Sequence, residues 1–353
     1  MRMRKHFATG AAMAAAATMV LTACGGGSST STSTSSSSSD SGAPKGTITV
    51  GSAYETTDYS PITTSALGMG ANWQVLEGLY RFDMSDYSVS PALAAGDPVK
   101  VSDTEYEISL RDGAKFSDGT DVKAADVVSS YERTTGDKSI FRQFFTFVDS
   151  VSAKDDKTVT VKLKYPFSNL KERFVNVHVV PSGMSEDALK AKPIGSGPYK
   201  YEAISATEIT AVPNEHYNGK IPAKVATLKW SALKDDAARL SAALGGSIDV
   251  MEAVPAAAQE QLKTAGWNVE AKPGYGNPFM MFNTQKAPFN KPEVRRAFLK
   301  AIDKQKLISS ALNGQAVEAK SFLPEANPAY KKPATDLSYD KDAAKKLLAD
   351  AGA

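Results

Sequence analysis

The sequence predicts an α/β protein with two lobes and mixed sheets. The chain has 353 residues, of which 42% are hydrophobic and 23% are charged, so it can bury a large core, and its length favours more than one lobe. Short apolar runs with strand character alternate along the chain with amphipathic runs at helical spacing, and this alternation is typical of the α/β class.

The amino terminus has the parts of a bacterial export signal. MRMRKH is basic, residues 7–21 form an Ala-rich apolar stretch that is too short for a convincing membrane span, and Leu-Thr-Ala then precedes Cys24. This order resembles the lipobox, in which the cysteine thiol is linked to diacylglycerol. We therefore predict that residues 1–24 are a lipoprotein signal peptide, that Cys24 is the lipidation site, and that the protein is anchored on the extracytoplasmic face of the cell membrane.

The mature chain that this signal implies carries little net charge. Removal of residues 1–23 leaves 38 basic residues against 39 acidic ones, so the net charge changes from +2 to −1. No basic patch interleaved with aromatic residues appears, and we expect no nucleic-acid partner. Cys24 is the only cysteine, which excludes an internal disulfide.

Residues 25–44, which begin GGGSSTSTSTSSSSSDSG, form the predicted linker. They offer almost no apolar surface to offset the entropy of ordering them, so we expect a flexible tether. A tether of this kind would hold a folded body away from a membrane.

The folded body is predicted to open with a short buried strand at 47–52. The polar loop 53–58 follows at the carboxyl end of that strand, which is where open α/β sheets bind ligands. Tyr54 and Glu55 in this loop are therefore candidate ligand contacts. The later elements are predicted as a helix at 70–79, a hairpin over 148–163, and strands at 208–212, 225–233 and 248–250. Helices are predicted at 236–244 and 342–351, and a helix pair with turn residues between is predicted to include 294–297 and 301–304.

The segment 110–133 combines a strand end, two turns and a helix. Residues 105–110 alternate between polar and apolar side chains, and two Asp-Gly dipeptides then form turns around Phe116, which is predicted to point inward. Asp121 is predicted to cap the helix that begins near Lys123.

This segment, with its Leu-Arg, Asp-Gly and Ala-Asp-Val pattern, resembles the signature region of the family 5 solute-binding proteins of ABC transporters, the peptide- and nickel-binding group. Other stretches resemble the same family in the same order. They are Glu-Gly-Leu at 77–79, Pro-Ala-Leu-Ala at 91–94, Gly-Ser-Gly-Pro-Tyr at 195–199, Asn-Glu-His-Tyr at 214–217, Ile-Asp-Val at 248–250, and the run 279–304. Ser196 stands where the family usually has threonine, which keeps the hydroxyl.

The resemblance implies a periplasmic-binding-protein-like two-lobe fold of type II, in its large peptide-binding subclass. It assigns residues 45–260 to lobe I, with an inserted subdomain at about 80–190, and residues 261–353 to the start of lobe II. In the family, a substantial further segment follows a helix like the one at 342–351. We therefore expect a truncated member without its C-terminal part, with apolar surface exposed around Phe282, Phe298 and Leu347.

A second set of candidate ligand contacts follows from the resemblance. Residues 279–284 are predicted to be a buried strand, and in the family this strand lines the cleft where the chain crosses between the lobes. Tyr275, Asn277, Phe279 and Met281 are therefore candidates. The alternative for Phe279 and Met281 is packing in the core.

The resemblance implies a lipid-anchored monomer that captures oligo- or dipeptides by hinge closure and delivers them to the permease subunits of an ABC importer, without a cofactor. A peptide can bond through its main chain while broad pockets accept its side chains. Two alternatives stay open: the same fold could bind a nickel chelate, a sugar or an opine, or it could serve as a sensor.

An enzyme is not expected. The mature chain has only His178 and His216 as histidines and lacks both G-x-S-x-G and H-E-x-x-H. The glycines at 195–197 do not form a phosphate loop, because no Lys-Ser/Thr pair follows them and Pro198 has no N–H to donate. We predict no catalytic residue and no metal site, and two structural histidines.

Overall fold

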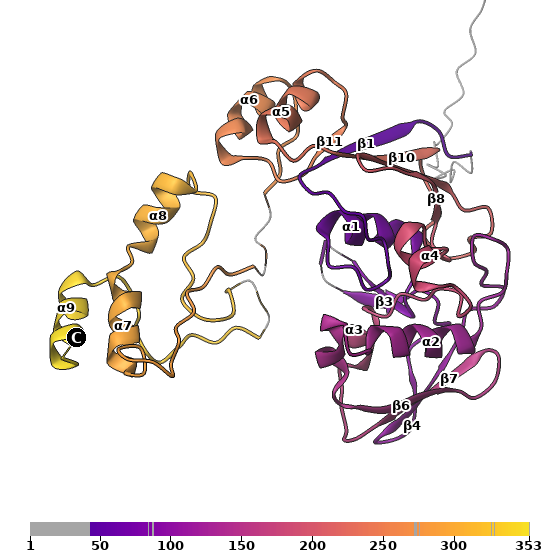
Figure 1. The fold of residues 1–353 in the computed structure, drawn as a ribbon, viewed down its shortest axis with the longest axis horizontal. Helices are drawn as coiled ribbons and strands as arrows, with labels where there is room; N and C mark the ends of the chain where they lie inside the picture. Colours follow the sequence, from indigo (N-terminus) through magenta and orange to yellow (C-terminus); the bar gives the residue numbers. More distant parts are fainter. Residues whose placement is uncertain are drawn as a thin grey trace, which may run out of the picture. The chain divides into compact units, whose positions relative to one another are not determined.

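The computed structural model describes residues 43–352, except 84, 87, 272, 273, 275, 326 and 328. The predicted signal peptide, Cys24 and almost all of the linker lie outside the described residues. Within them the chain forms mixed α/β structure, as the sequence predicts (Figure 1).

The main sheet is mixed and has the strand order β11-β1-β10-β9-β8. β1 is parallel to β10 on one side and to β11 on the other, whereas β9 is antiparallel to β10 and to β8. β1 and β10 lie side by side in Figure 1 although they are far apart in the sequence. The strands are β1 (Thr47–Ser52), β8 (Tyr199–Ile204), β9 (Glu208–Pro213), β10 (Thr227–Ala232) and β11 (Val250–Met251).

A second sheet and a short hairpin are antiparallel. The sheet has the order β4-β5-β7-β6, and the hairpin pairs β2 with β3. Their strands are β2 (Tyr80–Phe82), β3 (Val89–Pro91), β4 (Val99–Ser102), β5 (Glu105–Ser109), β6 (Val148–Ala153) and β7 (Thr158–Leu163). The predicted hairpin over 148–163 and the predicted strand at 105–110 are therefore confirmed.

The helices of the described residues are mostly short. They are α1 (Ala66–Val75), α2 (Ala124–Thr134), η1 (Ile140–Phe145), α3 (Leu170–Phe174), α4 (Glu186–Ala191), α5 (Asp236–Leu244), η2 (Ala256–Ala258), α6 (Gln259–Thr264), α7 (Pro292–Ala301), α8 (Lys304–Ala311) and α9 (Lys341–Asp350). The predicted helix at 70–79 is wrong in its bounds, because α1 ends at Val75. Leu76 is extended, and Gly78 then forms a β-bridge with His178, so tertiary pairing overrides the helical pattern.

The start of α2 differs from the prediction. Asp121 does not cap the helix; its carboxylate lies 2.6 Å from the ammonium of Lys115. The N-cap is Lys123, whose backbone N–H donates to Asp126 Oδ2 at 2.9 Å. Asp126 lies three residues inside the helix, so its carboxylate reaches back over the first turn and satisfies a free donor there.

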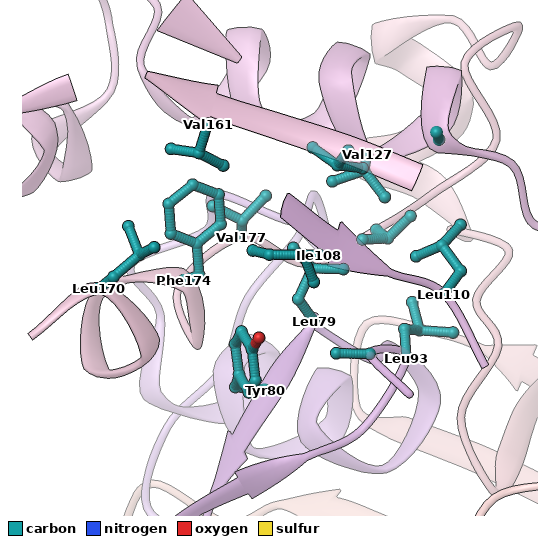
Figure 2. Packing of buried hydrophobic residues seen from close by; sticks show 14 of the residues in the cluster. Leu79, Tyr80, Leu93, Ile108, Leu110, Val127, Val161, Leu170, Phe174 and Val177 are labelled. Carbon is teal, nitrogen blue, oxygen red and sulfur yellow. The ribbon is translucent and has the colours of Figure 1, made fainter. Parts of the chain in front are cut away.

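The largest core cluster lies between the second sheet, α2 and α3. Phe116 points inward as predicted, and the β5 residue Ile108 is fully buried. Figure 2 shows the side chains of this cluster gathered from β2, β5, β7, α2 and α3. Separate clusters form around Trp230 of the main sheet and around Leu262 of α6. The lobe boundaries and the inserted subdomain stay predictions.

An Arg–Glu pair joins two of the family-like motifs. The Arg111 guanidinium makes two hydrogen bonds to Glu77, at 3.2 and 3.1 Å, and others to the backbone carbonyl of Ala92 and, at 2.9 Å, to Asn218 Oδ1. Glu77 is buried, and this burial raises the pKa of its carboxyl although Arg111 acts in the opposite direction. The pair therefore connects the strand end at 110–111 to the chain that follows α1.

Gly195 and Gly197 pack against the end of α1. The N–H of Gly197 donates to the carbonyl of Val75 at 2.9 Å, and the carbonyl of Gly195 accepts from the N–H of Ser117 at 2.8 Å. These glycines serve close backbone packing, which agrees with the rejection of a phosphate loop.

The Gly195→Ala substitution is therefore expected to lower the free energy of unfolding by about 2 kcal/mol. A methyl group at Gly195 would lie 2.1 Å from the Val75 carbonyl oxygen, and the backbone would have to move. Gly183→Ala is the matched control, since no atom lies within 4 Å of its added methyl. Urea denaturation of both variants checks this, and equal midpoints would contradict it.

The segment 276–352 contains α7, α8 and α9. α7 packs against α9, and a ring cluster forms from Phe282, Phe289 and Phe298, whose centroids are 5.3–5.8 Å apart. Apolar surface was expected to be exposed around Phe282, Phe298 and Leu347. Phe298 is exposed, as is Met281 next to Phe282, whereas Phe282 and Leu347 are themselves half-buried.

The prediction of a buried strand at 279–284 is wrong. This run joins no sheet within the described part of the chain, and Phe279 and Met281 are 68% and 83% exposed. The core-packing alternative for these two side chains is wrong for the same reason. An apolar run becomes a strand only where another strand supplies its hydrogen-bond partners.

Candidate functional site

The carboxyl ends of three parallel strands meet at one edge of the main sheet. Because β11, β1 and β10 run in the same direction, their ends lie side by side, in the register Gly51 opposite Met251 and Ser52 opposite Ala232. We call residues 52–55, 232–234 and 251–253 the carboxyl edge. Open α/β sheets bind their ligands at edges of this kind.

Ser52 holds the middle of the carboxyl edge together. Its side chain is fully buried, and its hydroxyl donates to Glu252 Oε2 at 2.6 Å. Ser52 Oγ also accepts from the N–H of Tyr54 at 3.2 Å. One hydroxyl thereby fixes the backbone that follows β1 and the carboxylate that follows β11.

The structure places the first pair of predicted site residues at this edge. The Tyr54 side chain is 46% exposed, so its ring is available to a ligand. The Glu55 carboxylate is exposed and lies 2.8 Å from the ammonium of Lys234, which follows β10. The carboxyl edge thus offers solvent one aromatic ring and two opposite charges.

Arg239 supports the edge from beneath. It belongs to α5, is 1% exposed, and donates to the carbonyls of Leu233 and Lys234 at 2.7 and 3.0 Å. It also donates to the carbonyls of Glu252 and Ala253, at 3.2 and 3.1 Å. A single guanidinium therefore ties the loop after β10 to the loop after β11.

The second set of predicted ligand contacts lies in the chain before α7 and consists of Tyr275, Asn277, Phe279 and Met281. Asn277 donates through its amide nitrogen to the carbonyls of Ser321 and Phe322, at 3.1 and 3.3 Å, and the rings of Phe279 and Phe322 are 6.3 Å apart. Tyr275 lies outside the described residues. No hydrogen bond, ion pair or ring contact among the described residues joins Tyr54 or Glu55 to this set.

Sequence reasoning missed three residues of the carboxyl edge and its support, namely Lys234, Arg239 and Glu252. Lys234 and Glu252 each follow a strand that the sequence predicted, so the rule that selected Tyr54 and Glu55 could have found them too. Arg239 gave no signal, because an arginine on an amphipathic helix is usually exposed.

The two histidines of the predicted mature chain lie in the described part of the fold, where the backbone N–H of His216 donates to Asn214 Oδ1 at 3.0 Å. His178 is half-buried with Nδ1 3.3 Å from the carbonyl oxygen of Pro61, and desolvation lowers its pKa. Three or more metal-ligating side chains do not gather anywhere in the described residues. Nor does any helix there have the length and apolar character needed to cross a bilayer.

Comparison with known proteins places the chain among binding proteins. Residues 88–353 match the family of bacterial extracellular solute-binding proteins, family 5. The glutathione-binding protein GsiB of Salmonella typhi is 28% identical over 321 residues, which cover 86% of this chain and 61% of that protein. The chain thus spans about three fifths of the length of the curated relatives it matches.

Solved structures share the fold. The binding protein AgaA of A. tumefaciens R10, in complex with agropinic acid, is 28% identical with a TM-score of 0.76, over 87% of this chain and 64% of that one. The oligopeptide-binding protein AppA of Bacillus subtilis, in complex with a nonapeptide, is 24% identical with a TM-score of 0.74, over 88% and 65%.

These similarities confirm the predicted periplasmic-binding-protein fold and agree with the prediction that the chain is not an enzyme. The family resemblance read from the motifs is confirmed as well. Because the family match covers most of the chain, the chain belongs to the bacterial extracellular solute-binding proteins of family 5.

Proposed function

We propose that this chain is the substrate-binding component of an ABC importer, which captures oligo- or dipeptides in a cleft between two lobes and delivers them to permease subunits. The observation that carries the proposal is the carboxyl edge, where Tyr54 and the Glu55–Lys234 pair are exposed at the ends of parallel strands. The relative that binds glutathione, which is itself a peptide, supports the same class of ligand.

The edge has the groups that a short peptide requires. A peptide in solution carries an ammonium group and a carboxylate, and Glu55 and Lys234 can exchange their mutual contact for these two charges. The Tyr54 ring supplies a flat apolar contact that tolerates many side chains. Differential contacts with a second lobe would then favour a closed state, which the permease recognises.

The wider organisation belongs to the same proposal. Residues 1–23 would be removed, Cys24 would be lipidated, residues 25–44 would tether the body to the membrane, and the protein would act as a monomer. Lobe I would comprise residues 45–260, with its inserted subdomain at about 80–190, and lobe II would begin at residue 261. Asn277, Phe279 and Met281, with Tyr275, would contact the ligand from the second lobe.

A second candidate ligand is an opine. The AgaA structure that holds agropinic acid supports it, since that protein is as similar to this chain as the glutathione-binding relative is. Calorimetric titration of the protein with a peptide pool and with agropinic acid separates the two ligands. Heat from agropinic acid alone would contradict the peptide proposal.

Tyr54→Ala is expected to weaken peptide binding by about tenfold, because aromatic anchors in binding sites are commonly worth more than 1 kcal/mol. Stability should change little, since the side chain is about half exposed. Tyr165→Ala is the matched control: Tyr165 is 50% exposed and lies outside the carboxyl edge. Calorimetric dissociation constants check the prediction, and equal affinities of the two variants would place the ligand elsewhere.

A further inference from the structure

The edge of the main sheet opposite the carboxyl edge carries basic side chains. The first residues of β1 and β10 pair with each other at this edge. The carbonyl of Gly46 accepts from the N–H of Ala226 at 3.1 Å, so the chain that precedes β1 lies beside the chain that precedes β10. We call residues 43–46 and 219–226 the amino patch. The patch has no acidic residue and three basic ones, Lys45, Lys220 and Lys224.

The charges of these three lysines are free in the part of the chain that the structure describes. All three side chains are exposed, and none forms an ion pair with a carboxylate there. Glu215, the acid that precedes the patch, is paired with Lys200 at 2.7 Å. Asp112, whose backbone carbonyl accepts from Asn218 at 2.8 Å, adds one acid beside the patch against its three lysines.

Two tyrosine hydroxyls hold the loop that carries Lys220 and Lys224. The buried Tyr199 accepts from the N–H groups of Lys224 and Val225, at 3.2 and 3.1 Å. Tyr217 accepts from the N–H of Ile221 at 3.3 Å, and the Ile221 side chain is 43% exposed. The backbone of the loop is therefore ordered before any partner binds, and it presents two charges and one apolar side chain without a further cost of ordering.

The two edges of the main sheet have opposite charge. β1 has six residues, so the edges are about 20 Å apart, which is longer than the Debye length of about 8 Å at physiological ionic strength. A charged surface therefore acts on the edge that faces it, and an anionic surface attracts the amino patch and repels the carboxyl edge. The carboxyl edge and the start of α5 together contain more acids than bases, namely Glu55, Asp235, Asp236 and Glu252 against Lys234 and Arg239.

We infer that the amino patch rests on the anionic phospholipid surface of the membrane, which leaves the carboxyl edge facing the solutes. Charge favours this partner, because lysines bind anionic headgroups and an exposed isoleucine can enter the boundary between headgroups and acyl chains. The path of the chain favours it too, because the predicted linker 25–44 enters the folded body at this patch. The inference rests on the proposed function only for the lipid anchor at Cys24.

The test is co-sedimentation of the full chain with two kinds of vesicle, one of phosphatidylcholine and one of equal parts phosphatidylcholine and phosphatidylglycerol. The preference for the anionic vesicles is measured for the wild type and for the triple variant Lys45→Gln, Lys220→Gln, Lys224→Gln. We expect this variant to lose about tenfold to a hundredfold of the preference, because each lysine near an anionic surface contributes about fivefold to the affinity.

The matched control is the triple variant Lys138→Gln, Lys157→Gln, Lys162→Gln. It removes three other exposed lysines that form no ion pair among the described residues, and it should retain the wild-type preference. The amino terminus, with its basic residues and any attached lipid, is the same in all these proteins, so its contribution cancels in the comparison.

The inference is supported if only the variant of the amino patch loses the preference and if Lys45→Arg, Lys220→Arg, Lys224→Arg keeps it. An ionic strength of about 1 M, where the Debye length is about 3 Å, should suppress the preference. Equal losses in the two glutamine variants, or a wild type without a preference, overturn the inference. A wild type that ignores phosphatidylglycerol, yet needs the patch to bind phosphatidylcholine vesicles that hold permease subunits, also overturns it and assigns the patch to a protein surface.

Peptide titration of the same variants keeps this inference apart from the proposed function. The patch lies opposite the carboxyl edge, so every variant should bind peptide with wild-type affinity. Absence of peptide binding by the wild type would overturn the peptide proposal and leave the lipid contact standing.

Discussion

Replacing Arg111 with methionine is expected to lower the free energy of unfolding by about 3–5 kcal/mol, because it leaves the buried carboxylate of Glu77 without its partner. The two hydrogen bonds between these side chains, at 3.2 and 3.1 Å, are lost together. Urea denaturation at pH 7 measures the loss. Arg142→Met is the control: Arg142 pairs with Asp137 at the surface, and removing such a pair should cost less than about 1 kcal/mol.

The loss of folding stability in Arg111→Met should also depend on pH, and it should be smaller at lower pH. Burial raises the pKa of Glu77, and Arg111 opposes this effect, so the variant raises that pKa further. A group whose pKa is higher in the folded state than in the unfolded state destabilises the fold as pH rises through the folded value. The deficit should therefore shrink as pH falls from 7 toward 5, and a deficit that stays constant over this range would contradict the assignment.

A double variant separates charge from shape. When Glu77→Leu accompanies Arg111→Met, no buried charge remains, so the double variant should be more stable than Arg111→Met alone. If the two substitutions were simply additive, the pair would contribute through packing rather than through its charges.

Arg239→Met is expected to cost about 2–4 kcal/mol of stability and to weaken ligand binding at the same time. Four backbone carbonyls that now accept from the guanidinium lose their donor, and a carbonyl left unpaired in a buried position costs about 1–3 kcal/mol. The carbonyls of Lys234 and Ala253 belong to exposed residues, so water can donate to them in place of the guanidinium and reduce the cost.

Two further variants show whether Arg239 acts through its hydrogen bonds. Arg239→Lys keeps the charge but has fewer and differently placed donors, so its stability should lie between those of the wild type and Arg239→Met. Arg296→Met, at an exposed position of α7, should change stability by less than about 0.5 kcal/mol. Denaturation midpoints and peptide affinities, measured for the same variants, check the predicted losses of stability and of binding. If Arg239→Met is destabilised but binds peptide with normal affinity, the prediction that Arg239 supports ligand binding is wrong.

Local sequence patterns predicted the elements better than the contacts between them. The strand at 47–52 and the helix at 236–244 have the predicted bounds, because alternation and amphipathic spacing are properties of neighbouring residues. Asp121 failed as a cap because Lys115 competes for its carboxylate, a contact across a turn that no capping rule includes.

The candidate site was predictable as a place and only partly as a set of residues. The rule on strand ends led to Tyr54 and Glu55, which the structure places at the carboxyl edge, and their contact with a ligand stays a prediction. It could not give the bond between Ser52 and Glu252, because these residues are 200 positions apart in the sequence. For the run 279–284 the sequence predicted a strand that does not form. The composition of this run is typical of a strand, but a strand also requires a neighbouring strand as its hydrogen-bond partner.

The separation of Ser52 from Glu252 also sets a delay in the folding of the main sheet. β1 is the first strand of the described chain to be made, and both of its neighbours, β10 and β11, are made long afterwards. At a synthesis rate of roughly 5–20 residues per second, the 200 intervening positions take about 10–40 s to appear. During that time both edges of β1 have unpaired backbone N–H and C=O groups, and such edges promote aggregation and chaperone binding. Only after both β10 and β11 have emerged, from the ribosome or across the membrane to which the predicted signal would direct the chain, can the parallel part of the sheet close. Any delay that holds back residues 227–251 therefore prolongs the vulnerable period.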